Sequence, residues 1–178
     1  MAIDRSKIRP GDLLLFRIVE KSSWLGKAIG FFSVLTGKQG SYKRTYGHVG
    51  LVESQYFYLE MTFPKSKRTE IKLDDPEAEL WRIENLTPEK AQKAIDWAKG
   101  NLGKWYNIRH IITLGFMKGY GCSDFVSNAF IQSGTGIVLS IEGRDDPVVS
   151  PNEIADSKQT LCVDTNGHDV VSENMWKE

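Results

Sequence analysis

The sequence predicts one α+β domain, and three observations support this fold class. The chain has 178 residues, long enough to bury a single hydrophobic core without metal or disulfide staples. Short apolar or alternating runs bounded by turn residues predict strands, and longer segments with apolar residues at helical spacing predict helices. No internal repeat, low-complexity segment or interdomain linker is visible. Residues 1–178 are therefore assigned to one domain, with residues 158–178 as a C-terminal extension of no assigned role.

Strands are predicted mainly in the first half of the chain. A Pro-Gly turn precedes an apolar run that predicts a first strand over residues 12–19. Residues 48–61 form two apolar runs around a Glu-Ser-Gln turn, which predicts a pair of short strands. Two alternating segments, at residues 67–73 and 79–84, are typical of half-exposed strands.

Helices are predicted at four places. An apolar stripe at helical spacing covers residues 24–35, and the clearest helix follows the N-cap residue Thr87 with a proline at its first position. A third helix begins at Cys122, and a short one follows Ser150. Residues 105–116 fit a helix and a buried strand equally well.

Charge and hydropathy exclude several classes of partner. Lys plus Arg and Asp plus Glu number 23 each, so no overall field favours nucleic acid or an anionic membrane. The longest apolar runs are only a few residues, so no integral membrane segment is expected. The N-terminal sequence is charged from its fourth residue on, unlike a secretory signal. A cytoplasmic protein is expected, and a phage-associated protein exported by another route is the alternative.

Cysteine usage argues against a disulfide or zinc scaffold. Cys122 and Cys162 are the two cysteines, and neither belongs to a CxxC or CxxH spacing. We therefore expect no structural metal and no cofactor.

Cys122 stands where a thiol can be made reactive. It begins a predicted helix, and a helix N-terminus carries partial positive charge and free N–H groups that favour a thiolate and can bind an oxyanion. Gly119 and Gly121 flank it and allow close approach of a substrate, while Ser123 and Asp124 give it no apolar cover. The alternative is an inert, buried cysteine.

A nucleophilic thiol needs a base, and the chain has three histidines. His48 opens an apolar strand directly after a glycine, at a junction where a side chain can enter a cleft. His110 lies in an apolar stretch and His168 in a polar turn near the C-terminus. Context therefore favours His48 as the base.

The base in turn needs an acceptor that orients its ring. If the two runs in residues 48–61 pair as a hairpin, Glu60 lies at the far end of the second strand, beside the start of the first. Glu60 is then the candidate for orienting His48, and Glu53, in the turn, is a weaker one.

The order of these segments carries a resemblance to a known family. The chain resembles the permuted papain-like cysteine hydrolases, the YiiX-type branch of the wider NlpC superfamily, to which lecithin retinol acyltransferase is also similar. The resemblance spans roughly residues 9–157 and rests on the segments "GDLLLF", "WLGKAIGFF", "GHVGLV", "YFYLE", "YGCSDFV" and "SPNEIADS". Each segment is short, and their order and spacing give the match its strength.

The resemblance implies a circularly permuted papain-like fold, with an antiparallel sheet or small barrel packed against helices. It implies Cys122 as nucleophile, His48 as general base and then general acid, and Glu60 as the residue that orients His48. The backbone N–H of Cys122 would form part of the oxyanion hole, with Tyr42 or Tyr46 as an added donor. Ser123 is a weak candidate for substrate contact.

The implied reaction is cleavage of an amide through a thioester at the cysteine. A peptide, a peptidoglycan fragment or a lipid amide is the expected substrate, with cell-wall stem peptides first among them.

Three alternatives stay open. A lipid acyltransferase or thioesterase would use apolar residues such as Trp24 and Phe32 as an acyl groove, and a non-catalytic relative would use the cleft for binding alone. In the third, His168 would serve as the base in an unpermuted Cys-then-His order. The polar context of His168 disfavours it.

Overall fold

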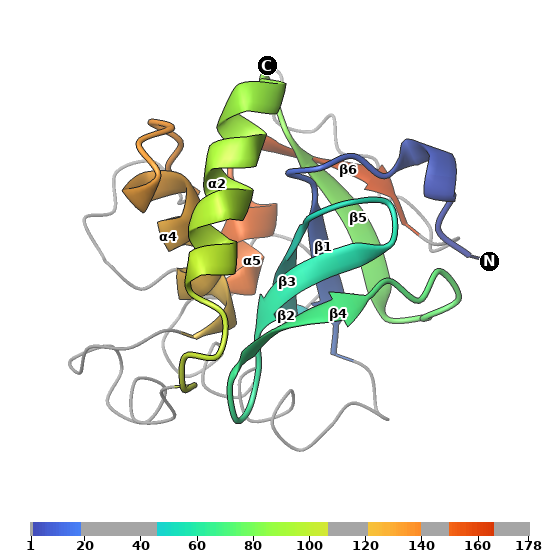
Figure 1. Ribbon diagram of the computed structural model, residues 1–178. Coiled ribbons are helices and arrows are strands. Elements are labelled where there is room, and N and C mark those ends of the chain that lie inside the picture. The colour runs from blue at the N-terminus through green and yellow to red at the C-terminus, as the bar shows by residue number, and fades with distance from the viewer. Residues whose placement is uncertain (1, 19–45, 107–120, 140–149, 166–178) are drawn as a thin grey trace.

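A six-stranded antiparallel sheet forms the centre of the computed structural model, which describes residues 2–18, 46–106, 121–139 and 150–165. The strand order is β4-β3-β2-β1-β5-β6, so β4 and β6 are the edges of an open sheet (Figure 1). The strands are β1 (Leu13–Arg17), β2 (Tyr46–Val52), β3 (Phe57–Met61), β4 (Ser66–Glu70), β5 (Ala78–Ile83) and β6 (Thr160–Asp164). The predicted α+β class is confirmed.

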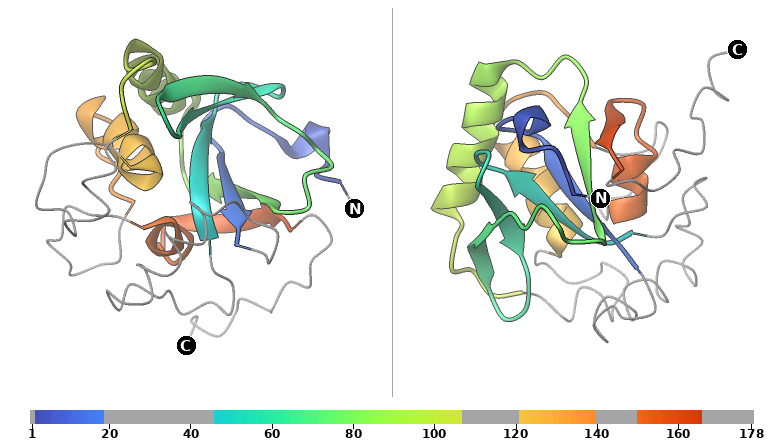
Figure 2. Two further views of the ribbon diagram at one scale, coloured as in Figure 1. Left: turned by 90° about the horizontal axis from the view of Figure 1, so that it is seen from below. Right: turned by 90° about the vertical axis from the view of Figure 1, so that its right-hand side faces the viewer.

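Helices pack against this sheet. They are the 3-10 helix η1 (Arg5–Lys7), α2 (Pro88–Gly100), α4 (Cys122–Gln132) and α5 (Pro151–Ala155). Helices α2 and α4 lie side by side against one side of the sheet, and α5 lies beside β6 (Figure 2). Helix α4 also contacts β2 and β3, and α5 contacts β2. The start of β2 is therefore held between two helices and the rest of the sheet.

The side chains of the central strand β1 point alternately to the two faces of the sheet, and a hydrophobic cluster covers each face. Leu13 and Leu15 face the larger hydrophobic cluster, which includes residues of α2, α4 and α5. Leu14 and Phe16 face a second, smaller cluster that the N-terminal segment closes with Ile3. The strand thus separates a helix-covered face from a face covered mainly by loops.

The Gly-Asp pair that opens β1 has a structural role. Gly11 has a φ of +89°, and a Cβ at this position would overlap Leu86 and Ala91 at the start of α2. The buried carboxylate of Asp12 accepts two hydrogen bonds from Arg82 of β5, each 2.8 Å long. The pair therefore fixes the first turn against both the helix and the neighbouring strand.

Most predicted elements are confirmed. The strands predicted at 12–19, 48–61, 67–73 and 79–84 are present as β1 to β5, with β2, β4 and β5 each beginning one or two residues earlier than predicted. The side chain of Thr87 caps α2 by accepting from the N–H of Lys90. The expected helix over 24–35 and most of the ambiguous segment 105–116 lie outside the described residues. Strand β6 lies in the region for which the sequence predicts no element.

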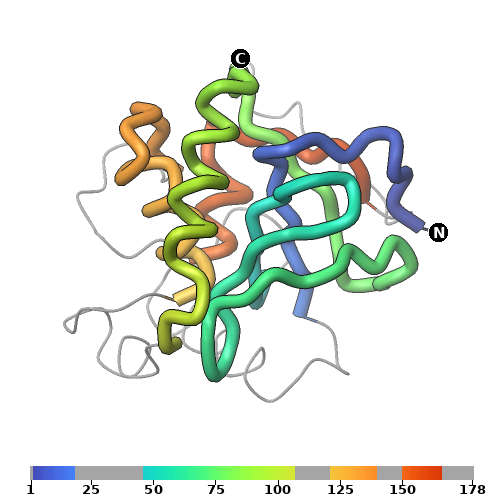
Figure 3. The backbone as a smooth tube through the Cα atoms, in the orientation of Figure 1, coloured from blue at the N-terminus to red at the C-terminus, as the bar shows by residue number. Residues whose placement is uncertain are grey.

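The start of β4 and the turn before it lie beside the segment after α2 (Figure 3), and backbone hydrogen bonds join the two. The N–H of Ser66 donates to Lys104 at 2.8 Å, and the N–H of Tyr106 donates to Pro64 at 2.9 Å. Segments far apart in sequence are thereby held next to each other at one end of the sheet.

Candidate active site

His48 and Glu60 come from the adjacent strands β2 and β3. The two strands pair from Gly50 to Val52, with Gly50 opposite Glu60. His48 is two residues before Gly50 on the same face of β2, so its ring is the diagonal neighbour of the Glu60 side chain. A Cβ at Gly50 would overlap the Tyr58 ring, so glycine here lets Tyr58 pack beside the pair.

Glu60 holds the imidazole through a short hydrogen bond. Nε2 of His48 lies 2.6 Å from Oε2 of Glu60, and Glu60 is only 5% exposed. Burial alone would raise the pKa of Glu60, but hydrogen bonding to His48 and the charge of its ring lower it below its usual value. Glu60 is therefore an ionised acceptor at neutral pH, as the orientation of a cationic imidazole requires.

Cys122 is the first residue of α4, with Gly121 as the N-cap. The helix start is closed by Asp124, whose Oδ2 accepts a 3.0 Å hydrogen bond from the N–H of Gly121. The Cys122 side chain is buried, within the cluster on the helix-covered face. Its own backbone N–H belongs to the first turn, where N–H groups have no partner within the helix.

His48 joins Cys122 to Glu60. Burial would lower the pKa of His48, but hydrogen bonding to Cys122 and to Glu60, together with electrostatic interaction with both groups, raises it to about 10. The structure thus brings together the three residues predicted from sequence, in the order thiol, imidazole, carboxylate.

The second oxygen of Glu60 is held from β4. Oε1 accepts a 2.6 Å hydrogen bond from the hydroxyl of Thr69 and lies 3.5 Å from the ammonium of Lys67. The Tyr58 hydroxyl also interacts with Glu60 and Thr69; burial first, and then the negative charge of Glu60, raises the pKa of Tyr58. Both carboxylate oxygens are therefore engaged, one on each side.

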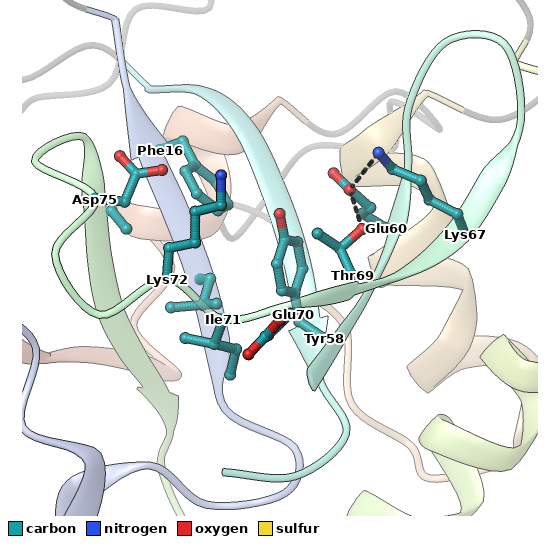
Figure 4. Close-up of a pocket in the computed structure, with 11 residues that line it drawn as sticks. Phe16, Tyr58, Glu60, Lys67, Thr69, Glu70, Ile71, Lys72 and Asp75 are labelled. Atoms are coloured by element: carbon teal, nitrogen blue, oxygen red, sulfur yellow. Dashed lines mark hydrogen bonds and ion pairs between the residues drawn. The ribbon is translucent and has the colours of Figure 1, made fainter. Parts of the chain in front are cut away.

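These groups line one wall of a pocket of about 170 Å³ on the face of the sheet that carries Phe16 and Tyr58 (Figure 4). The rings of Phe16 and Tyr58 are 5.7 Å apart, and Phe16 lies 5.5 Å from the His48 ring. In Figure 4, Thr69 and Lys67 both reach toward Glu60 from β4. The pocket therefore borders Glu60, whereas His48 and Cys122 are not among its lining residues.

Tyr46 does not serve the site in the way predicted for it. Its ring is fully buried and its hydroxyl donates a 2.5 Å hydrogen bond to the buried carboxylate of Glu79. Its backbone N–H donates to Oδ1 of Asn152 on α5 at 2.8 Å. Oxyanion stabilisation by Tyr46 is therefore corrected to a structural role, because the side chain anchors β2 two residues before His48.

The other candidates divide between structural residues and residues outside the described part. Ser123 is buried in the first turn of α4 beside the thiol. Glu53 pairs with Arg68 and Lys99, away from His48. Tyr42, His110, His168 and the residues of the expected acyl groove lie outside the described residues.

Tyr106 is a site residue that the sequence did not reveal. Its hydroxyl is 4.0 Å from the position of a Cβ at Gly121, directly before the thiol. Burial first, and then electrostatic interaction with Cys122 and Asp124, raise the pKa of Tyr106. The hydroxyl therefore stays protonated beside Cys122, available as a donor. Its position depends on the long-range backbone hydrogen bond to Pro64, which leaves no local sequence signal.

Neither a metal cluster nor a membrane span is found in the described part of the chain. Within it, no three His, Cys, Asp or Glu side chains converge in a way that could hold a metal ion. None of the described helices has the length and apolar character needed to cross a membrane.

Comparisons with known proteins identify the fold. No family model matches the chain, and no curated protein matches it. Among solved structures, the chain is similar to the crystal structure of metalloprotein YiiX from Escherichia coli O157:H7, DUF1105. The TM-score is 0.62 and the identity 21%, over 88% of this chain and 97% of that one. The likeness extends over nearly the whole of YiiX, and the chain shares its fold.

Proposed function

We propose that this protein is a cysteine-dependent hydrolase that cleaves an amide bond through Cys122, His48 and Glu60. The observation that carries the proposal is the position of His48, which is engaged by a buried carboxylate at 2.6 Å and by the thiol at the start of α4. The thiol of Cys122 lies at a helix N-terminus, and a protonated His48 lies between this thiol and Glu60. This arrangement favours the thiolate–imidazolium pair that nucleophilic cysteines use.

The chemistry proceeds in two stages. The Cys122 thiolate attacks the carbonyl carbon, and the imidazolium of His48 gives its proton to the departing amine, leaving a thioester. Water then adds to the thioester carbon while His48 removes one of its protons. The acid leaves, and the thiolate–imidazolium pair is restored. Glu60 stabilises the imidazolium at both ends of the cycle.

The papain-like, YiiX-type resemblance and the shared fold with YiiX support this proposal together. YiiX itself is described as a metalloprotein. The described residues of this chain do not fit such a group, since no three His, Cys, Asp or Glu side chains among them are arranged so that they could hold one metal ion. No step of the proposed reaction is therefore routed through a metal.

An amide is the favoured bond because its amine leaving group must be protonated as it departs, and an imidazolium beside the thiolate is placed to give that proton. Peptides, peptidoglycan fragments and lipid amides all present such a bond. We propose peptide amides, with the cell-wall stem peptide as the first substrate to test.

The decisive experiment is iodoacetamide alkylation of Cys122 between pH 4 and 9, read by peptide mass mapping. Cys162 on β6 is partly exposed and serves as a reference thiol within the same molecule. We expect Cys122 to react at pH 5–6, where an ordinary thiol with a pKa of about 8.5 is protonated. His48→Ala should remove this low-pH reactivity, and Glu60→Gln should reduce it.

A matched control is Glu53→Gln, which removes a carboxylate from the same hairpin without touching His48. If Cys122 reacts no faster than Cys162 at low pH, or is indifferent to His48→Ala, the thiol is not activated. The non-catalytic binding module then becomes the better description.

A further inference from the structure

Glu60 can orient His48 only if its own carboxylate is held still. Its side chain has three rotatable torsions, and one face of the carboxylate borders the pocket of about 170 Å³, from which water has access. The hydrogen bond from Oε2 to His48 does not by itself fix the rotation of the group about its last bond. A second contact on Oε1 is needed to do so.

We infer that Thr69 is a positioning residue that fixes Glu60 through the hydrogen bond from its hydroxyl to Oε1. This inference rests on the proposed function, in which Glu60 orients the base. It adds a fourth residue, from the edge strand β4, to the machinery that sets the reactivity of Cys122.

The sheet register places Thr69 for this task. Thr69 is opposite Tyr58 and Lys67 is opposite Glu60, so all four side chains share one face of β3 and β4. Thr69 is therefore the diagonal neighbour of Glu60, as His48 is on the other side. The carboxylate of Glu60 is hydrogen-bonded to a side chain from each flanking strand, to His48 through Oε2 and to Thr69 through Oε1, and each bond is 2.6 Å long.

Thr69 is a better anchor than the lysine on the same oxygen. The Lys67 side chain is 56% exposed, and its ammonium is 3.5 Å from Oε1 of Glu60. Thr69 is half-buried, and its hydroxyl is only 2.6 Å from the same oxygen. Threonine also has few χ1 rotamers in a strand, so its hydroxyl direction is largely fixed by the backbone. A long, solvated lysine gives charge but little direction.

The groups that face the His48–Glu60 pair are few among the described residues. From α4 the pair meets Cys122, from β3 Tyr58, and from β4 Thr69 and Lys67. The hydroxyls of Tyr58 and Thr69 are both neutral groups hydrogen-bonded to Glu60, and that of Thr69 makes the 2.6 Å bond to Oε1. Its removal therefore changes orientation without changing net charge.

The test compares Thr69→Val, which keeps the branched shape and loses the hydroxyl, with Thr69→Ser, which keeps the hydroxyl. The first measurement is the midpoint of the Cys122 alkylation profile. The second is the pKa of His48 by imidazole NMR in a Cys122→Ala background, where the thiol plays no part. We expect Thr69→Val to lower the pKa of His48 by roughly half to one unit, and to move the alkylation midpoint upward. Thr69→Ser should match the parent protein.

Lys67→Met provides the charge control, and it should shift both measurements less than Thr69→Val does. An unchanged His48 in Thr69→Val, or equal shifts in Thr69→Val and Thr69→Ser, would overturn the inference. The proposed function fails on a different result, namely that Cys122 is not alkylated at low pH or that His48→Ala leaves its alkylation rate unchanged. A thiol that responds to His48→Ala and Glu60→Gln but not to Thr69→Val would remove Thr69 alone from the mechanism.

Discussion

The hydroxyl of Tyr106 can be separated from the thiol chemistry by choosing two different electrophiles. Iodoacetamide reacts by displacement and forms no oxyanion, whereas an activated ester such as p-nitrophenyl acetate passes through a tetrahedral oxyanion. If Tyr106 donates to that oxyanion, Tyr106→Phe should slow acylation of Cys122 by about 10- to 100-fold. Alkylation by iodoacetamide should be nearly unchanged. Equal slowing of both reactions would instead mean that Tyr106 only supports the fold.

At the scale of single residues, a site residue could be predicted where the sequence around it carries a local signal. Cys122 is the first residue of α4, and Glu60 lies near the end of β3, whose hairpin partner β2 carries His48 near its start. The structure brings these three side chains together, although their catalytic roles stay predictions. Tyr106 and Thr69 carry no such signal, because each reaches the site through pairing between distant segments or across a third strand.

Among the elements, the short helix α5 contacts β2, the strand that carries His48. Asn152 accepts a buried hydrogen bond from the N–H of Tyr46, so Asn152→Ala removes this bond at a cost of about 1–3 kcal/mol. We expect lower stability in urea unfolding and an upward shift of the Cys122 alkylation midpoint. Ser150→Ala removes only the helix cap and should cost about 1 kcal/mol without moving the midpoint. A stability loss in Asn152→Ala with an unchanged midpoint would limit α5 to a structural role.

Elements with strong periodicity or caps were predictable, and one marginal strand was not. Helix α2 shows its cap and its apolar face in the sequence alone. Strand β6 is different, since the burial of its residues does not alternate strongly and it forms only by pairing with β5 at the sheet edge. Its existence depends on a partner far away in the chain, which local patterns do not encode.

For the whole molecule, the raised pKa of His48 links stability to pH. The unfolded value is near 6.5, so the folded chain holds a proton that the unfolded chain releases as pH rises above 6.5. The contribution is fully present below 6.5 and is lost as pH approaches the folded value, about 10 in the wild type. It can be isolated by comparing Cys122→Ala with Cys122→Ala/His48→Gln.

In that pair Glu60 alone raises the pKa of His48, so the window runs from 6.5 to a value below 10. We expect the difference in unfolding free energy between the two proteins to shrink as pH rises through this window. Urea unfolding at pH 6, 8 and 10 measures it, and changes in other titrating groups cancel in the difference. A difference that grows with pH would mean that His48 is neutral in the folded protein.

The separation of the site residues along the chain also has a consequence for biosynthesis. His48 and Glu60 are 12 residues apart on adjacent strands, and Cys122 follows much later, on α4. As the ribosome extends the chain from its N-terminus, the hairpin can form before the cysteine has emerged. Under the proposed function, the thiol then has ordinary reactivity until α4 docks on β2. We therefore expect the nascent protein to be protected from premature acylation and oxidation, with nucleophilicity arising only in the last step of folding.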